Sequence, residues 1–587
     1  MSQPYFALLP TPPSWPHCAL GSSPQHPIGC PGIRVPGHTS CLAHLTDADR
    51  DVYLAGLVPG SSFDHRGTTF TPLLLADLLN AVRDPATGHL RVGTVRFDAA
   101  TLEGEADFES VTFEGDATFE AATFKGDATF RSATFERTAT FRSVTFKTVA
   151  DFGSATFEGD ARFRWATFMG DAGYESVAFE RGAEFRSATF QRDATFRWAT
   201  FERAASLGPF VCAGRVVLSA AVFGSPVTLF FAARQLECRR TRWSSTAEIR
   251  LRYTRVDLTH AVFEYPLTIA AQRDPFLRPD GQRMAETLFV TEPNASVRVA
   301  SLRGVDASHL VLSDIDLSEC LFTGTVHLDR VHLEGACLFA TVPSGRHWRA
   351  WRPVRFTQRR TIAEEHHWRA RQPAAVPGWN RAAASAGRVG PAAVPGLNEA
   401  AAGAVHVGPL QLAPVYRALR KAFEDGKHEP GAADFYYGEM EMRRHADDIP
   451  RSERSLLTAY WALSGYGLRA SRALGWLAAC MLATIVLMMG FGLPENDPKQ
   501  RATGIVPAGG GSVTFEIEKA DPHNPTGNRF TGKRFERALK VTLNSVVFRS
   551  SGQDLTTTGT YIEMISRLTE PVLLGLAILA VRNRVKR

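Results

Sequence analysis

Three cysteines and a histidine near the start of the chain have the side chains and the spacing of a metal site. Cys18, Cys30, Cys41 and His44 follow the pattern Cys-x11-Cys-x10-Cys-x2-His within loops that are rich in Gly and Pro. Thiolates and an imidazole are the ligands that tetrahedral Zn²⁺ prefers, and two ligands three residues apart reach one ion from a single turn. These residues are therefore predicted to hold a structural zinc ion, with free thiols in a mobile tail as the alternative.

The rest of the chain has no motif for catalysis. It contains no Gly-rich phosphate loop, no His-Glu-x-x-His and no nucleophile elbow. His17, His26 and His38 compete as ligands for the zinc ion, whereas the sequence Glu-Glu-His-His at 364–367 is expected to form an exposed charged stretch. We therefore expect no enzymatic activity, no catalytic residues and no cofactor other than zinc.

A regular aromatic repeat occupies the middle of the chain and must position everything around it. From Phe97 to Phe201 a large side chain, nearly always Phe, returns after steps that alternate between five and six residues. We call these the anchor positions. Ala or Val stands two residues before each anchor, and a polar residue lies between them. The anchors in the first half of the repeat are Phe97, Leu102, Phe108, Phe113, Phe119, Phe124, Phe130, Phe135, Phe141 and Phe146.

An 11-residue period can also describe a right-handed coiled coil, but the angles exclude it here. At about 98° per residue, the two anchors of one period lie roughly 130° apart on a helix, so no single apolar stripe forms. The repeat is also rich in Thr, Phe and Gly, which form helices poorly. The Ala-x-Phe unit alternates with the period of a strand, lasts three residues and then turns. The pattern predicts a β-solenoid whose anchors fill the axis.

The unit Ala-(Thr/Asp)-Phe-x-x resembles the repeat of the pentapeptide-repeat proteins. That resemblance implies a right-handed, quadrilateral β-helix with one repeat on each face. This chain differs because every second unit has a sixth residue, commonly within Gly-Asp, as at Gly115-Asp116 and Gly159-Asp160. Four faces then take 22 residues instead of 20. The extra residue is expected to form a regular bulge at two opposite corners, where Gly and Asp tolerate unusual dihedral angles.

The anchor pattern weakens after Phe201, blurs between residues 231 and 251, and is interrupted by an expected loop at 271–294. The solenoid is predicted to comprise about ten coils. A Leu-rich segment, 70–84, is expected to cap its first coil as a helix, because exposed strand edges need covering. The full prediction is a Cys/His segment (1–60), a helical cap (61–94), the solenoid (95–345), a low-complexity linker (346–408), a cytoplasmic αα-hairpin (409–465) and a two-span membrane module with an extracytoplasmic loop (466–587).

Two apolar segments near the C-terminus predict a membrane hairpin. Residues 473–494 carry no charge over 22 positions, which is long enough to span a bilayer. Arg469 and Arg472 precede this span and acidic residues follow it, so the positive-inside rule places its N-terminal side in the cytoplasm. The second span, 561–581, contains charges, and a helix on the membrane surface is its alternative. No signal peptide is expected. The solenoid and both termini are thus predicted to be cytoplasmic, at a bacterial inner membrane.

The predicted function is a membrane-anchored scaffold or adaptor that binds an unidentified protein. A regulated channel or transporter is one alternative, because a short helix is expected between the spans, at 537–548, although the sequence lacks a Thr-Val-Gly-Tyr-Gly filter. The family resemblance adds a second alternative, a DNA mimic that binds topoisomerase. Residues 103–201 carry 17 acidic and 11 basic side chains, a modest net charge of −6. The whole chain, at +6, gives no indication of nucleic-acid binding, and self-association is left open.

Overall fold

The computed structural model describes residues 12–24, 26–278, 280–292, 294–345, 347–349, 352–354, 356–372, 379, 407–495, 500–504, 509, 515–519, 522–524, 527–547, 550 and 552–585. The chain divides into two compact units, Met1–Asp434 and Phe435–Arg587. Most of the predicted low-complexity linker lies outside the described residues.

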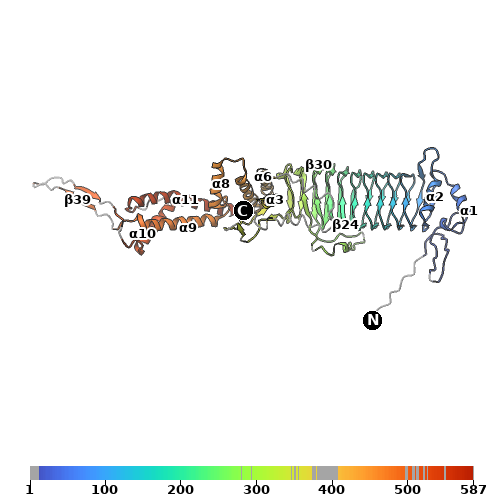
Figure 1. Ribbon diagram of the computed structural model, residues 1–587, viewed down its shortest axis with the longest axis horizontal. Helices are drawn as coiled ribbons and strands as arrows, with labels where there is room; N and C mark the ends of the chain where they lie inside the picture. Colours follow the sequence, from blue (N-terminus) through green and yellow to red (C-terminus); the bar gives the residue numbers. More distant parts are fainter. Residues whose placement is uncertain are drawn as a thin grey trace, which may run out of the picture. The chain divides into compact units, whose positions relative to one another are not determined.

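The first unit is a parallel β-solenoid of about 11 turns, as the anchor pattern predicts (Figure 1). Four short strands make one coil, and in the regular region, residues 95–179, each strand pairs in parallel with the strand 22 residues later. Thus Thr134 and Phe135 pair with Thr156 and Phe157. The four-sided coil and its 22-residue period are confirmed.

The regular strands form four columns. The first column comprises β1 (Phe63–Asp64), β4 (Val95–Arg96), β8 (Ala117–Thr118), β12 (Ala139–Thr140), β16 (Ala161–Arg162) and β20 (Ala183–Glu184). The second comprises β2 (Thr69–Phe70), β5 (Thr101–Leu102), β9 (Thr123–Phe124), β13 (Thr145–Phe146), β17 (Thr167–Phe168) and β21 (Thr189–Phe190). The third comprises β6 (Ala106–Asp107), β10 (Ala128–Thr129), β14 (Ala150–Asp151), β18 (Ala172–Gly173) and β22 (Ala194–Thr195). The fourth comprises β3 (Leu90–Val92), β7 (Val111–Phe113), β11 (Thr134–Phe135), β15 (Thr156–Phe157), β19 (Ala178–Phe179), β23 (Thr200–Phe201), β25 (Val222–Phe223), β27 (Arg242–Trp243) and β30 (Val262–Phe263).

Stacked aromatic rings fill the axis of the solenoid. The ring centroids of Phe113 and Phe135 are 4.6 Å apart and the rings are parallel within 2°. Rings of neighbouring columns meet edge to face, as Phe130 and Phe141 do at 5.4 Å and 84°. Both arrangements are favourable for aromatic quadrupoles. Because all of these rings are buried, the core excludes water along the whole regular region.

The corners of the coil differ from the predicted ones in their chemistry. The five-residue steps contain the left-handed residues, which are non-glycine residues, mostly small ones such as Ser132 (φ 53°) and Ser154 (φ 57°), but also Trp165 and Trp198. The Gly-Asp pairs lie in the six-residue steps, where Gly159 has no positive φ. A Cβ atom at Gly159 would lie 2.2 Å from the carbonyl oxygen of Arg137 in the preceding coil. The expectation of unusual dihedrals at these glycines was therefore wrong, because close backbone contact is what requires them.

The aspartates of these corners accept hydrogen bonds from backbone N–H groups of the next coil. The Asp116 carboxylate accepts a hydrogen bond from the Thr138 N–H at 3.1 Å, and Asp127 accepts one from Val149 at 3.2 Å. Each partner lies 22 residues later. The extra residue of the six-residue step thus provides a carboxylate that satisfies a backbone donor where no strand pairing does.

The anchor pattern blurs after Phe201 because the coil shortens from 22 to 20 residues. Ser206 pairs with Thr228, 22 positions on, whereas Arg215 pairs with Gln235, 20 positions on, after two register shifts. Long strands continue around a corner here. The strands of this region are β24 (Ser206–Val217), β26 (Val227–Glu237), β28 (Ala247–Arg252), β29 (Arg255–Asp257), β31 (Leu267–Ala271), β32 (Arg298–Ser301), β33 (Leu310–Ser313) and β34 (His332–Glu334).

The expected loop at 271–294 lies outside the solenoid wall and packs back on it. Phe276, Met284 and Phe289 contact Val211 and Ala232 of β24 and β26. The loop contains the 3-10 helix η2 (Thr287–Phe289). Two further 3-10 helices, η3 (Ala307–His309) and η4 (Leu328–Arg330), lie in the last coils.

Helices cover the first coil, which begins earlier than Val95. Strands β1 and β2 already pair with β4 and β5. The helix α2 (Pro72–Ala81) is inserted after β2, and the Thr71 hydroxyl accepts a hydrogen bond from the Leu74 N–H at its start. The 3-10 helix η1 (Leu42–His44) and helix α1 (Asp47–Ala55) precede β1.

The other end of the solenoid is covered by segments that the sequence assigned partly to a linker. Strand β35 (Ala340–Thr341) pairs antiparallel with β38 (Arg360–Thr361), and β36 (His347–Arg349) pairs with β37 (Arg352–Val354). Helix α3 (Ala363–Ala370) follows, and α6 (Pro409–Asp425) packs against it and against η4. Residues 360–370 therefore belong to the folded end of the solenoid.

The second unit is helical. Its helices are the C-terminal part of α7 (Glu429–His445), α8 (Arg451–Ser464), α9 (Ala470–Leu487), the π-helical turn η5 (Met488–Gly492), α10 (Gly532–Val546) and α11 (Thr557–Val585). The antiparallel strands β39 (Gln500–Gly504) and β40 (Phe515–Lys519) lie between η5 and α10. Met488, Met489 and Val541 form an apolar core between α9, η5 and α10, against which Ile562 of α11 packs.

The aromatic core gives a first prediction, made with two substitutions in the same column. Phe152→Ala removes a ring stacked on Phe130 and Tyr174, and we expect it to lower the free energy of unfolding by about 3–5 kcal/mol. Tyr174→Phe should instead raise it by about 1 kcal/mol, because the buried Tyr174 hydroxyl has no hydrogen-bond partner among the described residues. Denaturation of the purified chain, followed by circular dichroism, measures both. A neutral Phe152→Ala would contradict the stacked core.

Candidate functional site

Two short backbone ladders and one helical turn bring the four predicted metal ligands together. The N–H of Cys18 donates to the carbonyl of Gly32 at 2.8 Å, and the N–H of Cys30 donates to Leu20 at 2.9 Å. Cys41 lies directly before η1, and the N–H of His44 donates to its carbonyl at 2.9 Å. The ligand atoms of Cys18, Cys30, Cys41 and His44 all lie within 4.8 Å of one another.

The spacing of these ligand atoms fits a tetrahedral ion. With metal–sulfur bonds of about 2.3 Å, two sulfur atoms on a tetrahedral zinc lie about 3.8 Å apart, and a sulfur and a nitrogen about 3.5 Å apart. The Cys30 and Cys41 sulfur atoms are 3.7 Å apart. The Nδ1 atom of His44 lies 3.3 Å from the Cys41 sulfur and 3.7 Å from the Cys18 sulfur. The four residues can therefore hold a metal ion without rearrangement.

The electrostatics of the cluster favour loss of a thiol proton. A hydrogen bond from the Cys41 thiol lowers the pKa of Cys30 to about 5, and the same bond raises the pKa of Cys41. A thiolate is the form that binds a metal. A Cβ atom at Gly32 would lie 2.9 Å from the Cys41 sulfur, so the glycine leaves room for the cluster.

The Cys/His cluster belongs to a segment that covers the open edge of the first coil. The N–H of Ile33 donates to the carbonyl of Arg66 at 2.8 Å, and the Arg66 guanidinium lies 4.9 Å from the centroid of the Trp15 ring. Beneath this segment His65 is buried, and burial lowers its pKa to about 4. Its Nε2 atom lies 3.3 Å from the Tyr53 hydroxyl. A metal ion at the cluster would thus stabilise the N-terminal cover of the solenoid.

The Glu-Glu-His-His stretch is buried, so its prediction as an exposed stretch was wrong. Glu364 caps the last coils, because its carboxylate accepts hydrogen bonds from the N–H groups of Phe322 and Thr323. Burial raises the pKa of Glu364 and lowers the pKa of His366 to about 4. His366 lies 2.7 Å from the Thr361 hydroxyl.

Glu365 is the centre of a buried ionic network. Its carboxylate accepts two hydrogen bonds from Arg359, at 2.6 and 2.7 Å, and further bonds from Arg369 and the Tyr416 hydroxyl. Burial opposes ionisation of Glu365, but the charges of Arg359 and Arg369 outweigh it and lower its pKa well below the usual range. The network links α3 to α6, so these residues are structural and do not form a metal site.

One histidine and two cysteines of the solenoid also have structural surroundings. The Nδ1 atom of His327 lies 3.0 Å from the carboxylate of Asp306 at the surface. Cys212 and Cys320 are fully buried, and burial raises the pKa of both thiols.

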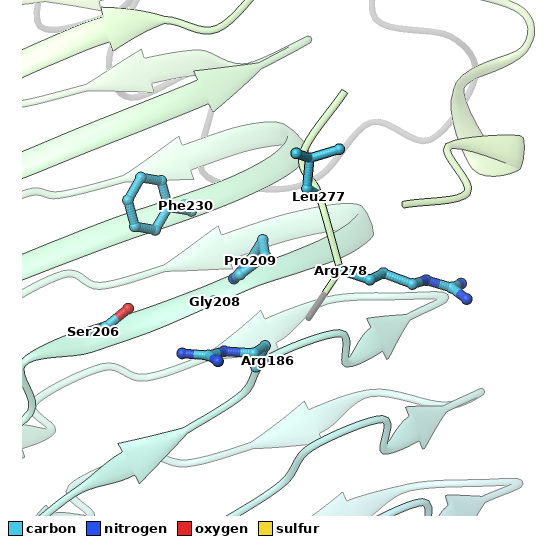
Figure 2. A pocket seen from close by; sticks show the side chains of 7 residues that line it. All are labelled: Arg186, Ser206, Gly208, Pro209, Phe230, Leu277 and Arg278. Carbon is cyan, nitrogen blue, oxygen red and sulfur yellow. The ribbon is translucent and has the colours of Figure 1, made fainter. Parts of the chain in front are cut away.

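The solenoid wall carries a small groove where the outer loop approaches β24 and β26. Figure 2 shows the side chains that line it. They are Arg186, Ser206, Gly208, Pro209, Phe230, Leu277 and Arg278. The groove encloses about 150 Å³ and is open to solvent. Small-molecule sites are usually larger than about 300 Å³ and enclosed, so this groove suits one or two side chains of a protein partner.

Two tryptophans lie at corners of the solenoid, Trp165 partly buried between β16 and β17, and Trp198 exposed between β22 and β23. The Trp165 ring lies between the guanidinium groups of Arg142 and Arg164, at 4.9 and 4.8 Å from its centroid. Trp198 is 56% exposed and lies next to Arg197. Trp and Arg are the residues that most often dominate the energetics of protein interfaces.

Two helices of the second unit are long and apolar enough to cross a membrane, Ala470–Gly492 and Thr557–Arg582. Large apolar side chains are exposed along both of them. On α9 and η5 these are Leu474, Trp476, Leu482, Val486, Leu487 and Phe491, and on α11 they include Ile565, Leu568, Val572, Ile578, Leu579 and Val581.

Comparison with known proteins identifies the repeat. The family described as pentapeptide repeats (9 copies) matches residues 97–145 and 130–173. No curated protein and no solved structure matches the chain.

The buried histidine beneath the N-terminal segment predicts a pH dependence of stability. Because the folded-state pKa of His65 is about 4 and an unfolded histidine has a pKa of about 6.5, the unfolded chain binds more protons between these values. Acidification through this window should lower the free energy of unfolding, on the order of 3 kcal/mol for this residue. The substitution His65→Phe should remove this part of the dependence, since aromatic rings already surround the site. Unfolding curves at stepped pH test this, and parallel profiles for both proteins would refute it.

Proposed function

The chain is a member of the pentapeptide-repeat family, and we propose that it is a non-enzymatic, membrane-anchored scaffold whose solenoid binds a protein partner. One observation carries the proposal: the solenoid is filled by its own rings, so its chemistry is confined to the outer faces. These faces are rigid and regular, and they expose Trp, Arg and a groove of side-chain size. Such a surface suits recognition of another protein.

The helices α9 and α11 are proposed to anchor the scaffold in a membrane. Their exposed leucine, valine and isoleucine side chains would be costly in water and favourable in hydrocarbon. Arg469 and Arg472 at the start of α9 and the basic residues at the C-terminal end of α11 support an orientation with both ends in the cytoplasm. The solenoid would then lie on the cytoplasmic side of a bacterial inner membrane.

The N-terminal cluster is proposed to bind a structural zinc ion. Three thiolates and one imidazole with tetrahedral spacing match zinc better than harder ions such as Mg²⁺ or Ca²⁺. All four positions are filled by side chains, which is typical of structural sites and not of catalytic ones. Zinc would supply a cross-link between the loops that cover the first coil.

The scaffold proposal predicts a partner that depends on the two corner tryptophans. The full chain, cross-linked in native membranes and purified, should retain one abundant protein, and Trp165→Ser with Trp198→Ser should lower its recovery at least tenfold. A control variant, Thr156→Ser in β15, should keep it. The chain itself should resist extraction from membranes by alkaline carbonate. Equal recovery with all variants would contradict binding by this surface, and release by carbonate would contradict the anchor.

The zinc proposal predicts one ion for each chain. Mass spectrometric metal analysis of the purified full chain should find about one zinc per polypeptide, and Cys41→Ser should lose it. Cys337→Ser, a half-buried cysteine outside the cluster, is the matched control and should keep the ion. Removal of zinc by a chelator should also lower the melting temperature of the solenoid. A metal-free native protein would end the zinc proposal.

A further inference from the structure

A carboxyl group lies buried in the middle of the second apolar helix. Glu570 belongs to α11 and is completely buried, with 0% of its surface exposed. It faces α9, where the Thr484 hydroxyl lies 2.9 Å from its Oε1 atom. Ionisable side chains at such positions are rare because charge is poorly solvated in hydrocarbon, and they mark functional sites.

The hydrogen bonds around Thr484 indicate which form of the carboxyl is present. The Thr484 hydroxyl also lies 3.0 Å from the carbonyl oxygen of Cys480. A carbonyl can only accept, and a hydroxyl has one proton to donate. If Thr484 donates to Cys480, as helical threonines commonly do to the preceding turn, then Glu570 must donate to Thr484. Glu570 can do so only as a neutral carboxylic acid.

The second carboxyl oxygen supports the same assignment. Oε2 of Glu570 is buried and has no hydrogen-bond partner among the described residues. A buried carboxylate would need compensation at both oxygens, whereas a neutral acid leaves one weaker acceptor unsatisfied. No salt bridge to Glu570 occurs among the described residues.

Hydroxyl groups lie near Glu570 on all three helices. Thr569 lies 3.5 Å from the Cys480 sulfur atom, and Ser566 donates to Ser545 of α10 at 3.0 Å. Pro571 follows Glu570 and cannot donate the backbone hydrogen bond that would normally reach the carbonyl of Arg567. Hydroxyl groups and a helix backbone that lacks one hydrogen bond thus surround Glu570.

We propose that Glu570 is a proton-binding site within the membrane hairpin, occupied by a proton at neutral pH. The bound proton lets Glu570 donate to Thr484 and holds α11 against α9. Loss of the proton would leave a charge between the two helices and separate them at this level. The proposal rests on the membrane anchoring described above, and it gives the anchor a chemical activity of its own.

Other titratable and charged groups lie on the helices packed around this site. They include Arg472 and Cys480 on α9, Tyr561, Glu563, Arg567 and Arg582 on α11, Lys533, Arg534, Glu536, Arg537 and Lys540 on α10, and Arg451, Glu453, Arg454 and Tyr460 on α8. The experiment must therefore identify the reacting residue by its position.

Dicyclohexylcarbodiimide, an apolar reagent, tests whether the proton is present. A protonated carboxyl adds across its C=N bond, the proton passes to nitrogen, and the product rearranges to an N-acylurea without loss of an atom. With the full chain in membranes at neutral pH, peptide mass spectrometry should find this adduct on Glu570. The yield should fall as the pH is raised. The control is Val572→Glu in a Glu570→Gln background, which places a carboxyl on the exposed face of α11. If the reagent modifies this control but leaves Glu570 of the native chain unmodified, the proposal is overturned.

A second measurement does not depend on whether the reagent reaches Glu570. Glu570→Gln mimics the neutral acid, so in detergent it should melt like the native chain at neutral pH and lose less stability at alkaline pH. Identical alkaline melting profiles for both proteins would overturn the proposal. Retention of the chain by carbonate-washed membranes is measured in the same preparation. A retained chain with identical melting profiles shows failure of the proton site, whereas a released chain shows failure of the anchor.

Discussion

Parallel stacking of identical side chains at 22-residue intervals is the constraint on which the solenoid depends. Phe135 lies between Phe113 and Phe157, with centroid distances of 4.6 and 4.7 Å. A strand of two residues contributes little by itself, so the coil holds together only when every ring has a ring above and below it. The same constraint fixes the register, because a slip by one residue would turn the rings into solvent.

The first and last coils of the solenoid have exposed strand edges, and polar side chains from segments outside the repeat cover both of them. At the first coil the cover is the segment with Cys18, Cys30, Cys41 and His44 together with α2. At the last coil Glu364 satisfies two backbone donors that no further strand could pair with. The Cys/His cluster and the carboxylate network thus cover the exposed strand edges at the two ends with different groups.

The sequence predicted the regular coils well because they are a local pattern, and the structure brings Cys18, Cys30, Cys41 and His44 together, as their spacing indicated. Phe, Ala and Thr at fixed spacing determine the solenoid, and Cys41 and His44 lie within one turn. The role of Glu365 could not be predicted, because Tyr416 lies 51 residues away in the chain and Arg359 is an ordinary residue in the sequence. The shortening of the coil to 20 residues was not predicted, and the sequence showed only an irregular anchor spacing. The two register shifts occur inside β24 and not at a turn, so no turn residue marks them.

Two buried glutamates show how surroundings decide what a carboxyl group does. Glu365 is enclosed by Arg359, Arg369 and Tyr416, which donate to it and keep it charged, so it holds α3 and α6 in place. Glu570 has one hydroxyl for a partner, and that hydroxyl has a carbonyl competing for its proton. A charge there would have nothing to balance it. The first carboxyl is therefore a fixed cross-link, whereas the second can hold α9 and α11 together only while its proton is bound.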